Sequence, residues 1–148
     1  MPVHDQEVFA ARLDSTPRIR EFVARACARA GIADGDRFAF ELAVDEACTN
    51  IIEHGYDTEV AGQIALEFEA DDTAARVTIV DTGRSFDPAD AAPPEPGTDL
   101  LERPLGGLGI LLIRKAMDEV HYRAEPTGNR LVLIKKLQSR SPVRPGKE

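Results

Sequence analysis

Hydrophobic and polar positions alternate with two different periods along the chain, and the period separates helices from strands. Residues 15–32 repeat apolar side chains at three- and four-residue spacing, which predicts an amphipathic helix. The apolar positions are Ile19, Phe22, Val23, Ala26, Cys27 and Ala30. We expect Thr16 to be its N-cap, Pro17 its first helical residue and Gly31 its stop. A strand over residues 6–13 precedes this helix, and a second, longer helix runs from Asp34 or Asp36 to Tyr56.

The second half of the chain reads mainly as strands. Residues 62–70 alternate strictly, with Ile64, Leu66 and Phe68 on one side, which predicts a half-buried strand. A turn at residues 71–73 leads to another strand over residues 75–81. A helix over residues 106–120 and a hairpin over residues 119–137, turned at residues 126–128, complete the order. The sum predicts an α+β fold, a two-layer sandwich of a mostly antiparallel sheet with about three helices on one face.

Length and composition bound the function. At 148 residues, with 43% hydrophobic and 30% charged residues, the chain predicts a single domain over residues 1–137. Residues 138–148 are expected to form a flexible tail, and the proline-rich residues 84–105 a lid. No apolar run reaches the length of a membrane span and no signal peptide is visible, so we expect a cytoplasmic protein. The net charge of −8 argues against direct nucleic-acid binding.

The cysteine and histidine residues do not indicate a disulfide or a metal site. Cys27 and Cys48 lie far apart in apolar surroundings, which indicates buried free thiols. The three histidines, His4, His54 and His121, have no second ligand at helical or loop spacing, so a zinc site is not expected.

The second predicted helix carries polar residues that a core helix does not need. Its core stripe is Phe40, Val44, Ala47, Cys48 and Ile51. Glu46, Asn50, Glu53 and His54 fall on the other side, with Glu46 and Asn50 one turn apart. A solvated face is one interpretation. The other is a site in which an Asn oxygen binds Mg²⁺ and a carboxylate takes a proton from an attacking hydroxyl.

Two further segments carry chemistry. Asp81 ends an apolar run and begins Asp-Thr-Gly, which is typical either of an aspartic protease or of a strand that ends in a carboxylate accepting from a purine amino group. Gly106, Gly107 and Gly109 precede an apolar helix. They form neither a Walker loop nor Gly-x-Gly-x-x-Gly. Such glycines predict either a hinge or backbone amides that approach an anion at the helix N-terminus.

Three segments stand in order along the chain: "ELAVDEACTNIIEHGY", "IVDTGRSFDP" and "RPLGGLGILLIRKAMDEV". Together they resemble the N, G1 and G2 boxes of the GHKL ATPases, which have the Bergerat fold. Within that superfamily the chain resembles the small anti-sigma-factor serine/threonine-protein kinases of the RsbW and SpoIIAB type. The likeness favours the base-reading interpretation of Asp81 over the protease.

The resemblance implies a role for each matching residue. It implies that Glu46 is the general base and that Asn50 is the Mg²⁺ ligand, with His54 near the phosphates. It implies that Asp81 accepts from the adenine amino group and that Gly83 lies beneath the ring. The phosphate-binding residues that it implies are Arg103, Gly106, Gly107, Leu108 and Gly109. Many relatives carry a small hydroxyl residue on the final strand near the adenine, where this chain has Asn129 followed by Arg130.

The resemblance also implies a function. It implies a kinase that uses ATP and Mg²⁺ to phosphorylate a STAS-domain anti-anti-sigma protein, that sequesters a sigma factor, and that forms a homodimer. An alternative from the class of binding modules is a regulator of the same fold that switches partners without phosphoryl transfer, or that acts on a target other than sigma.

Overall fold

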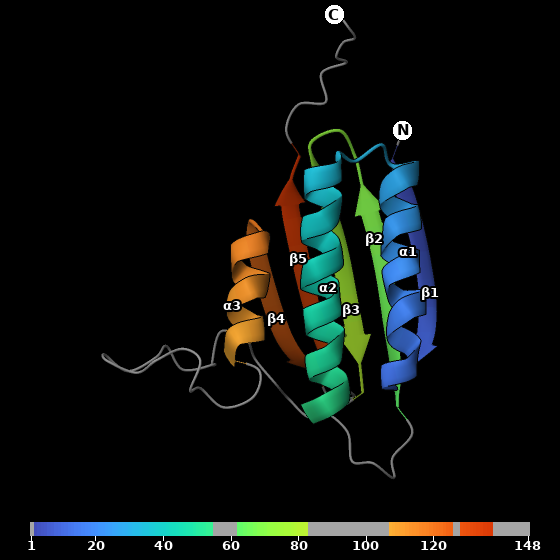
Figure 1. Ribbon diagram of the computed structural model, residues 1–148, viewed down its shortest axis with the longest axis vertical. Coiled ribbons are helices and arrows are strands. Elements are labelled where there is room, and N and C mark those ends of the chain that lie inside the picture. The colour runs from blue at the N-terminus through green and yellow to red at the C-terminus, as the bar shows by residue number, and fades with distance from the viewer. Residues whose placement is uncertain (1, 55–61, 83–106, 126–127, 138–148) are drawn as a thin grey trace, which may run out of the picture.

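The computed structural model describes residues 2–54, 62–82, 107–125 and 128–137. Within these residues five strands form one antiparallel sheet in the order β1-β2-β3-β5-β4, and the helices cover one face of it (Figure 1). The bounds of the elements are β1 Val3–Ala10, the short 3₁₀ helix η1 Leu13–Ser15, α1 Thr16–Arg29, α2 Asp34–His54, β2 Gln63–Ala70, β3 Ala74–Asp81, α3 Gly107–Ala116, β4 Glu119–Glu125 and β5 Gly128–Lys136. The predicted α+β sandwich is therefore confirmed.

The first strand lies earlier in the chain than its pattern predicted. β1 pairs along its whole length with β2, from Val3 opposite Ala70 to Ala10 opposite Gln63, so the partner strand sets both of its ends. The predicted strand over residues 6–13 was therefore wrong in position. Leu13 belongs instead to η1, where its side chain is exposed.

The start of α1 also differs from the prediction. Its N-cap is Ser15, not Thr16, and the Thr16 hydroxyl donates to the Leu13 carbonyl at 2.9 Å. Pro17 lies in the first turn, where a missing N–H costs no helical hydrogen bond. Gly31 has a φ of 71°, the left-handed conformation that ends helices, so the predicted stop is confirmed.

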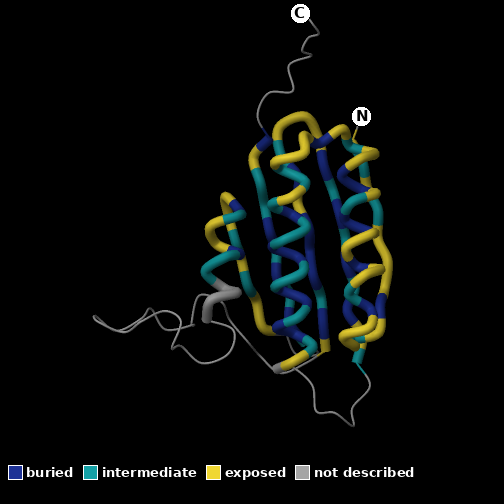
Figure 2. Tube along the Cα trace, in the orientation of Figure 1, coloured by how far each residue is buried: buried dark blue, intermediate teal, exposed yellow. Residues whose placement is uncertain are grey.

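The core lies between the sheet and the helices, as the distribution of buried residues shows (Figure 2). The predicted alternation in β2 is confirmed, because Ile64, Leu66 and Phe68 are all buried. The rings of Phe40 on α2 and Phe68 on β2 meet edge to face, with centroids 6.2 Å apart. This contact fixes α2 over the middle of the sheet.

α2 is the central helix, and it contacts both α1 and α3. It begins at Asp34, and the predicted end at Tyr56 lies outside the described residues. The predicted core stripe is buried. Asn50 is only 6% exposed, however, so its placement on a polar face was wrong. The reason is that helices on both sides of α2 cover its flanks, and only a narrow outer stripe of α2 reaches solvent.

The predicted helix over residues 106–120 was too long, because Glu119 and Val120 pair with β5 and α3 ends at Ala116. The other connections agree with the predictions that they test. The Asp71 carboxylate accepts from the amides of Thr73 and Ala74 at 2.8 and 3.0 Å, which forms the β2–β3 turn. Glu125 of β4 pairs with Gly128 of β5, as a hairpin requires. Cys27 and Cys48 are buried free thiols, as expected. Among helices in the described part of the chain, none is long and apolar enough to cross a membrane.

Candidate functional site

The second half of α2 carries Glu46, Asn50 and His54 at four-residue spacing, so the three residues follow one flank of the helix. Glu46 is half-buried and Asn50 is buried. His54 is the last residue of α2, and its side chain lies outside the described residues. The spacing predicted from sequence therefore places a carboxylate and an amide side by side in the folded chain.

The electrostatic setting of Glu46 suits proton transfer. Its pKa is raised, first because burial disfavours the charged form and then because Asp45 and Glu53 on the same helix repel a further negative charge. A carboxylate whose pKa moves toward neutrality is a better acceptor for a hydroxyl proton. Glu46 therefore has the chemistry of a general base.

The amide of Asn50 is an unusual buried group. Its Nδ2 atom is buried without a hydrogen-bond partner among the described residues. Leaving such a donor unpaired costs about 1–3 kcal/mol, and natural proteins tolerate this mainly where the group serves a purpose. A neutral amide oxygen one turn from a carboxylate is a hard oxygen ligand, so the residues present here fit a Mg²⁺ ion.

Asp81 ends β3 on the face of the sheet that the helices cover. It is only 4% exposed, and the alternation along β3 puts it on the same side as Val77 and Ile79. Its charge reaches α2. The pKa of the Cys48 thiol is raised, first by burial and then by the negative charges of Asp45 and Asp81. β3, which ends at Asp81, also contacts α2 directly.

A neighbouring amide holds the Asp81 carboxylate in place. Asn129 of β5 pairs directly with Asp81 in the register, and its Nδ2 donates to Asp81 Oδ1 at 3.1 Å. The hydroxyl of Tyr122, on β4, donates in turn to Asn129 Oδ1. Asp81 is thus tied to an amide in an α+β fold, which does not fit the aspartic-protease interpretation.

The N-terminal end of α3 lies at the same end of the molecule. In Figure 1 the C-terminal ends of α2 and β3 and the N-terminal end of α3 all lie at the lower edge of the layered part. Gly107, Leu108 and Gly109 form the first turn of α3, and their side chains are not described. Free amides and a partial positive charge at a helix N-terminus attract anions. The other predicted site residues, Gly83, Arg103 and Gly106, lie outside the described residues, as does the predicted lid.

Sequence reasoning missed the roles of Asn129, Tyr122 and Gly128. Asn129 is 3% exposed and shares the helix-facing side of β5 with Leu131 and Leu133, so Arg130 belongs to the opposite face. A Cβ atom on Gly128 would lie 1.8 Å from the Asp81 carbonyl oxygen, so only glycine fits there. The alternation of apolar and polar side chains over residues 129–133 was the sequence pattern that could have revealed the position of Asn129. It indicates which side Asn129 takes, but not which residue it meets.

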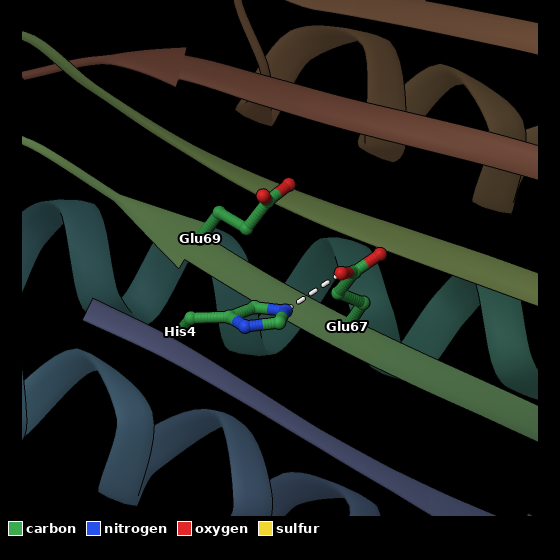
Figure 3. Close-up of side chains that lie close together, drawn as sticks. All are labelled: His4, Glu67 and Glu69. Atoms are coloured by element: carbon green, nitrogen blue, oxygen red, sulfur yellow. Dashed lines mark hydrogen bonds and ion pairs between the residues drawn. The ribbon is translucent and has the colours of Figure 1, made fainter. Parts of the chain in front are cut away.

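A second polar cluster lies on the sheet face away from the helices. His4 of β1 meets Glu67 and Glu69 of β2, with ligand atoms within 4.8 Å of one another (Figure 3). His4 Nε2 lies 2.6 Å from Glu67 Oε2, and Arg76 Nε donates to Glu69 Oε1 at 3.0 Å. Strand pairing brings these residues together, so spacing along the chain could not reveal them. The Arg76 guanidinium pairs with the Glu69 carboxylate. The cluster is therefore a surface ion-pair network, and it lies apart from the candidate site.

Comparison with known proteins agrees with the geometry. The profile of the histidine kinase-like ATPase domain family matches residues 9–135. Serine-protein kinase RsbW of Halalkalibacterium halodurans is 32% identical over 151 residues, covering 93% of this chain and 88% of its own. The protein of the same name from Bacillus velezensis is 32% identical over 110 residues, covering 72% of this chain and 69% of its own.

Two solved structures share the fold. The RsbU and RsbW domains of Rv1364c from Mycobacterium tuberculosis superpose with a TM-score of 0.65 at 20% identity, over 93% of this chain. This chain spans 32% of that longer protein. A blue-light-activated histidine kinase domain from Erythrobacter litoralis superposes with a TM-score of 0.51 at 22% identity, over 84% of this chain and 60% of its own. At these identities the likeness establishes the fold alone.

Proposed function

Because the chain belongs to the histidine kinase-like ATPase family, we propose that it is an ATP-dependent protein serine/threonine kinase that controls transcription by partner switching. Its substrate is a STAS-domain anti-anti-sigma protein, and its second partner is a sigma factor that it sequesters. Phosphorylation of the first partner prevents that partner from binding, which leaves the kinase free to hold sigma. The likeness to relatives named serine-protein kinase RsbW supports the transferase activity.

One observation supports the proposal: a buried carboxylate at the end of β3 and an amide and a carboxylate on the C-terminal half of α2 are side chains of the types that the chemistry needs. Asp81 is a buried carboxylate held by an amide, Asn50 has a buried Nδ2 atom with no hydrogen-bond partner among the described residues, and Glu46 is a half-buried carboxylate with a raised pKa. A kinase needs to hold a purine, to neutralise phosphates and to accept a proton.

Each residue of the proposed site has one role in this mechanism. Asp81 accepts a hydrogen bond from the 6-amino group of adenine, and Gly83 leaves room for the ring. The amides of Gly106, Gly107, Leu108 and Gly109, with the Arg103 guanidinium, bind the phosphates. The Asn50 amide oxygen would hold Mg²⁺, with His54 nearby, and the ion would neutralise charge on the phosphates. Glu46 orients the serine hydroxyl of the partner and accepts its proton, while positioning of the two reactants supplies most of the acceleration.

The test has two stages. The first measures binding of ATP by calorimetry in the presence of Mg²⁺, and the second measures transfer of the labelled γ-phosphate to a STAS-domain protein encoded in the same genome. Glu46→Gln is expected to bind ATP as the wild type does but to lose phosphoryl transfer, because the amide cannot accept the proton.

Asp34→Asn is the matched control, because Glu53 itself contributes to the raised pKa of Glu46. It removes a carboxylate from the same helix at an exposed position, so transfer is expected to continue. If folded wild-type protein gives no heat with ATP, the proposal is wrong. ATP binding without transfer to any STAS-domain protein of that genome would favour the alternative, a regulator that switches partners without chemistry.

The assembly and location that we propose also follow from the resemblance. We propose a cytoplasmic homodimer, and light scattering of the purified protein measures its mass directly. A monomeric mass at micromolar concentration would contradict this part of the proposal without affecting the kinase assignment.

A further inference from the structure

Three side chains form a directed series of hydrogen bonds that runs from the outer strand β4 to the site. The Tyr122 hydroxyl donates to Asn129 Oδ1, and Asn129 Nδ2 donates to Asp81 Oδ1 at 3.1 Å. Asn129 and Asp81 are 3% and 4% exposed. Because Asn129 lies directly opposite Asp81 in the β3–β5 register, the backbone also holds the two side chains in proximity.

The direction of this series follows from the chemistry of its members. An ionised carboxylate can only accept, so the NH₂ end of the Asn129 amide must face Asp81. The amide oxygen then faces Tyr122, whose hydroxyl must donate. If the amide turned over, two acceptors would meet at Asp81, so the carboxylate sets the orientation of the amide. Tyr122 anchors that orientation by donating to the amide oxygen, although Tyr122 and Asp81 are separated by the amide.

We infer that Asn129 and Tyr122 are positioning residues that hold the Asp81 carboxylate as an acceptor and thereby set a preference for adenine over 6-oxo purines. Adenine carries an amino donor at C6, whereas hypoxanthine and guanine carry a carbonyl acceptor there. A carboxylate held in one rotation by a fixed donor favours the amino group and repels the carbonyl. This inference rests on the proposed function, because it requires a purine nucleotide at Asp81.

The positioning of Asp81 depends on which side chain the final strand places beside it, and in this chain that side chain is Asn129. Arg130, the residue after Asn129, lies on the opposite face of the sheet and does not take this place. Asn129 supplies its donor from an amide, and Tyr122 holds that amide in place by donating to its oxygen. A hydroxyl at position 129 could donate without such a partner, because it rotates freely.

The experiment compares three ligands by calorimetry in the presence of Mg²⁺: ATP, ITP and inorganic tripolyphosphate. ATP and ITP differ only at C6, which carries an amino or an oxo group, and at N1, which carries a hydrogen only in ITP; tripolyphosphate reports phosphate binding alone. We expect the wild type to prefer ATP to ITP. Tyr122→Phe should lower ATP affinity about two- to tenfold, as loss of one hydrogen bond does. Affinity for ITP and tripolyphosphate should stay within about twofold.

Variants of Asn129 extend the series. Asn129→Leu removes the donor to a charged acceptor and should reduce the ratio of ATP to ITP affinity about tenfold or more. Asn129→Thr restores a donor hydroxyl and should recover part of that ratio. His121→Ala, next to Tyr122 but on the exposed side of β4, is the matched control and should leave all three affinities unchanged.

The outcomes separate the two proposals. A merely structural role would lower the affinities for ATP, ITP and tripolyphosphate together; an unchanged ATP-to-ITP ratio in Tyr122→Phe and Asn129→Leu overturns the inference and leaves the kinase assignment intact. Equal binding of ATP and ITP by the wild type also overturns it. No binding of ATP by the wild type removes both. Should Asn129→Leu fail to fold, Tyr122→Phe alone decides, because it keeps every carbon atom of the ring.

Discussion

Substitution of Gly128 by alanine tests whether the end of the β3–β5 ladder fixes the position of Asp81. A Cβ atom at position 128 would lie 1.8 Å from the Asp81 carbonyl oxygen, 2.8 Å from its carbonyl carbon and 2.9 Å from the Thr82 Cα. All three are backbone atoms, so no side-chain rotation can relieve the contact. The φ of 158° at Gly128 is, in addition, one that L-residues rarely adopt.

The size of the effect follows from these distances. Real Cβ atoms essentially never approach another atom within 3.0 Å, so the two strands must separate by at least 1.2 Å at this point. A shift of that size breaks the 3.1 Å contact between Asn129 and Asp81. Losing a hydrogen bond to a buried carboxylate costs about 1.5–3 kcal/mol and losing a strand-pair bond costs about 1 kcal/mol. We expect Gly128→Ala to lower the free energy of unfolding by about 2–4 kcal/mol.

Urea denaturation and calorimetry with ATP measure the two consequences. ATP affinity should fall about tenfold or more, because a displacement of about 1 Å misaligns a hydrogen-bonding group. Gly35→Ala is the matched control: a Cβ atom there meets nothing within 4 Å, and alanine in the first turn of α2 should leave stability unchanged or raise it by up to about 1 kcal/mol. If Gly128→Ala unfolds within about 0.5 kcal/mol of the wild type and binds ATP equally well, the close approach at Asp81 is refuted.

Three further predictions concern single side chains. The pKa of Glu46 is raised on folding, chiefly by burial, so its ionisation opposes folding. Glu46→Gln should therefore be as stable as the wild type below pH of about 4, and more stable than the wild type as the pH rises through the folded pKa. Urea titrations across pH 3–8 measure this difference. Burial raises the pKa of the Cys27 thiol to about 12 and also raises the pKa of the Cys48 thiol. Both thiols should therefore react with a disulfide reagent at pH 8 only after unfolding. Fast labelling of the native protein would contradict this. Phe68→Ala should cost about 3–5 kcal/mol in the same urea assay, whereas Phe68→Leu should retain most of the stability.

The regular elements could be predicted from sequence because their burial patterns are local. Ile64, Leu66 and Phe68 alternate within one strand, and the stripe that contains Phe40 and Val44 repeats within one helix, so neither pattern depends on a distant residue. The first strand was misplaced because its ends depend on pairing with β2, which its own residues do not encode. Asn50 was assigned to a polar face because a single helix cannot reveal that α1 and α3 cover its flanks.

In the candidate site, too, local patterns could be predicted from sequence and long-range contacts could not. Glu46 and Asn50 are one turn apart, so helical spacing alone predicted their proximity, and Asp81 followed from the end of an apolar strand. The contact between Asp81 and Asn129 joins residues on β3 and β5 that only the sheet register aligns. Tyr122 is a step further, since it reaches the site through that amide. Tertiary pairing thus determined the residues that sequence reasoning missed.

The two halves of the site differ in how they are held, and this difference predicts how mutations will divide. Asp81 and Asn129 are buried strand residues joined by a hydrogen bond, so the base-reading half is complete before a nucleotide binds. Glu46 is only half-buried, and the Nδ2 atom of Asn50 has no hydrogen-bond partner in the described part of the chain, so the half that we propose faces the phosphates is left with an unsatisfied group. Preorganised contacts act on ground state and transition state alike, whereas groups satisfied only during transfer act on the rate. Substitutions at Asn129 should therefore raise KM for ATP with little change in kcat, and substitutions at Glu46 should lower kcat with little change in KM.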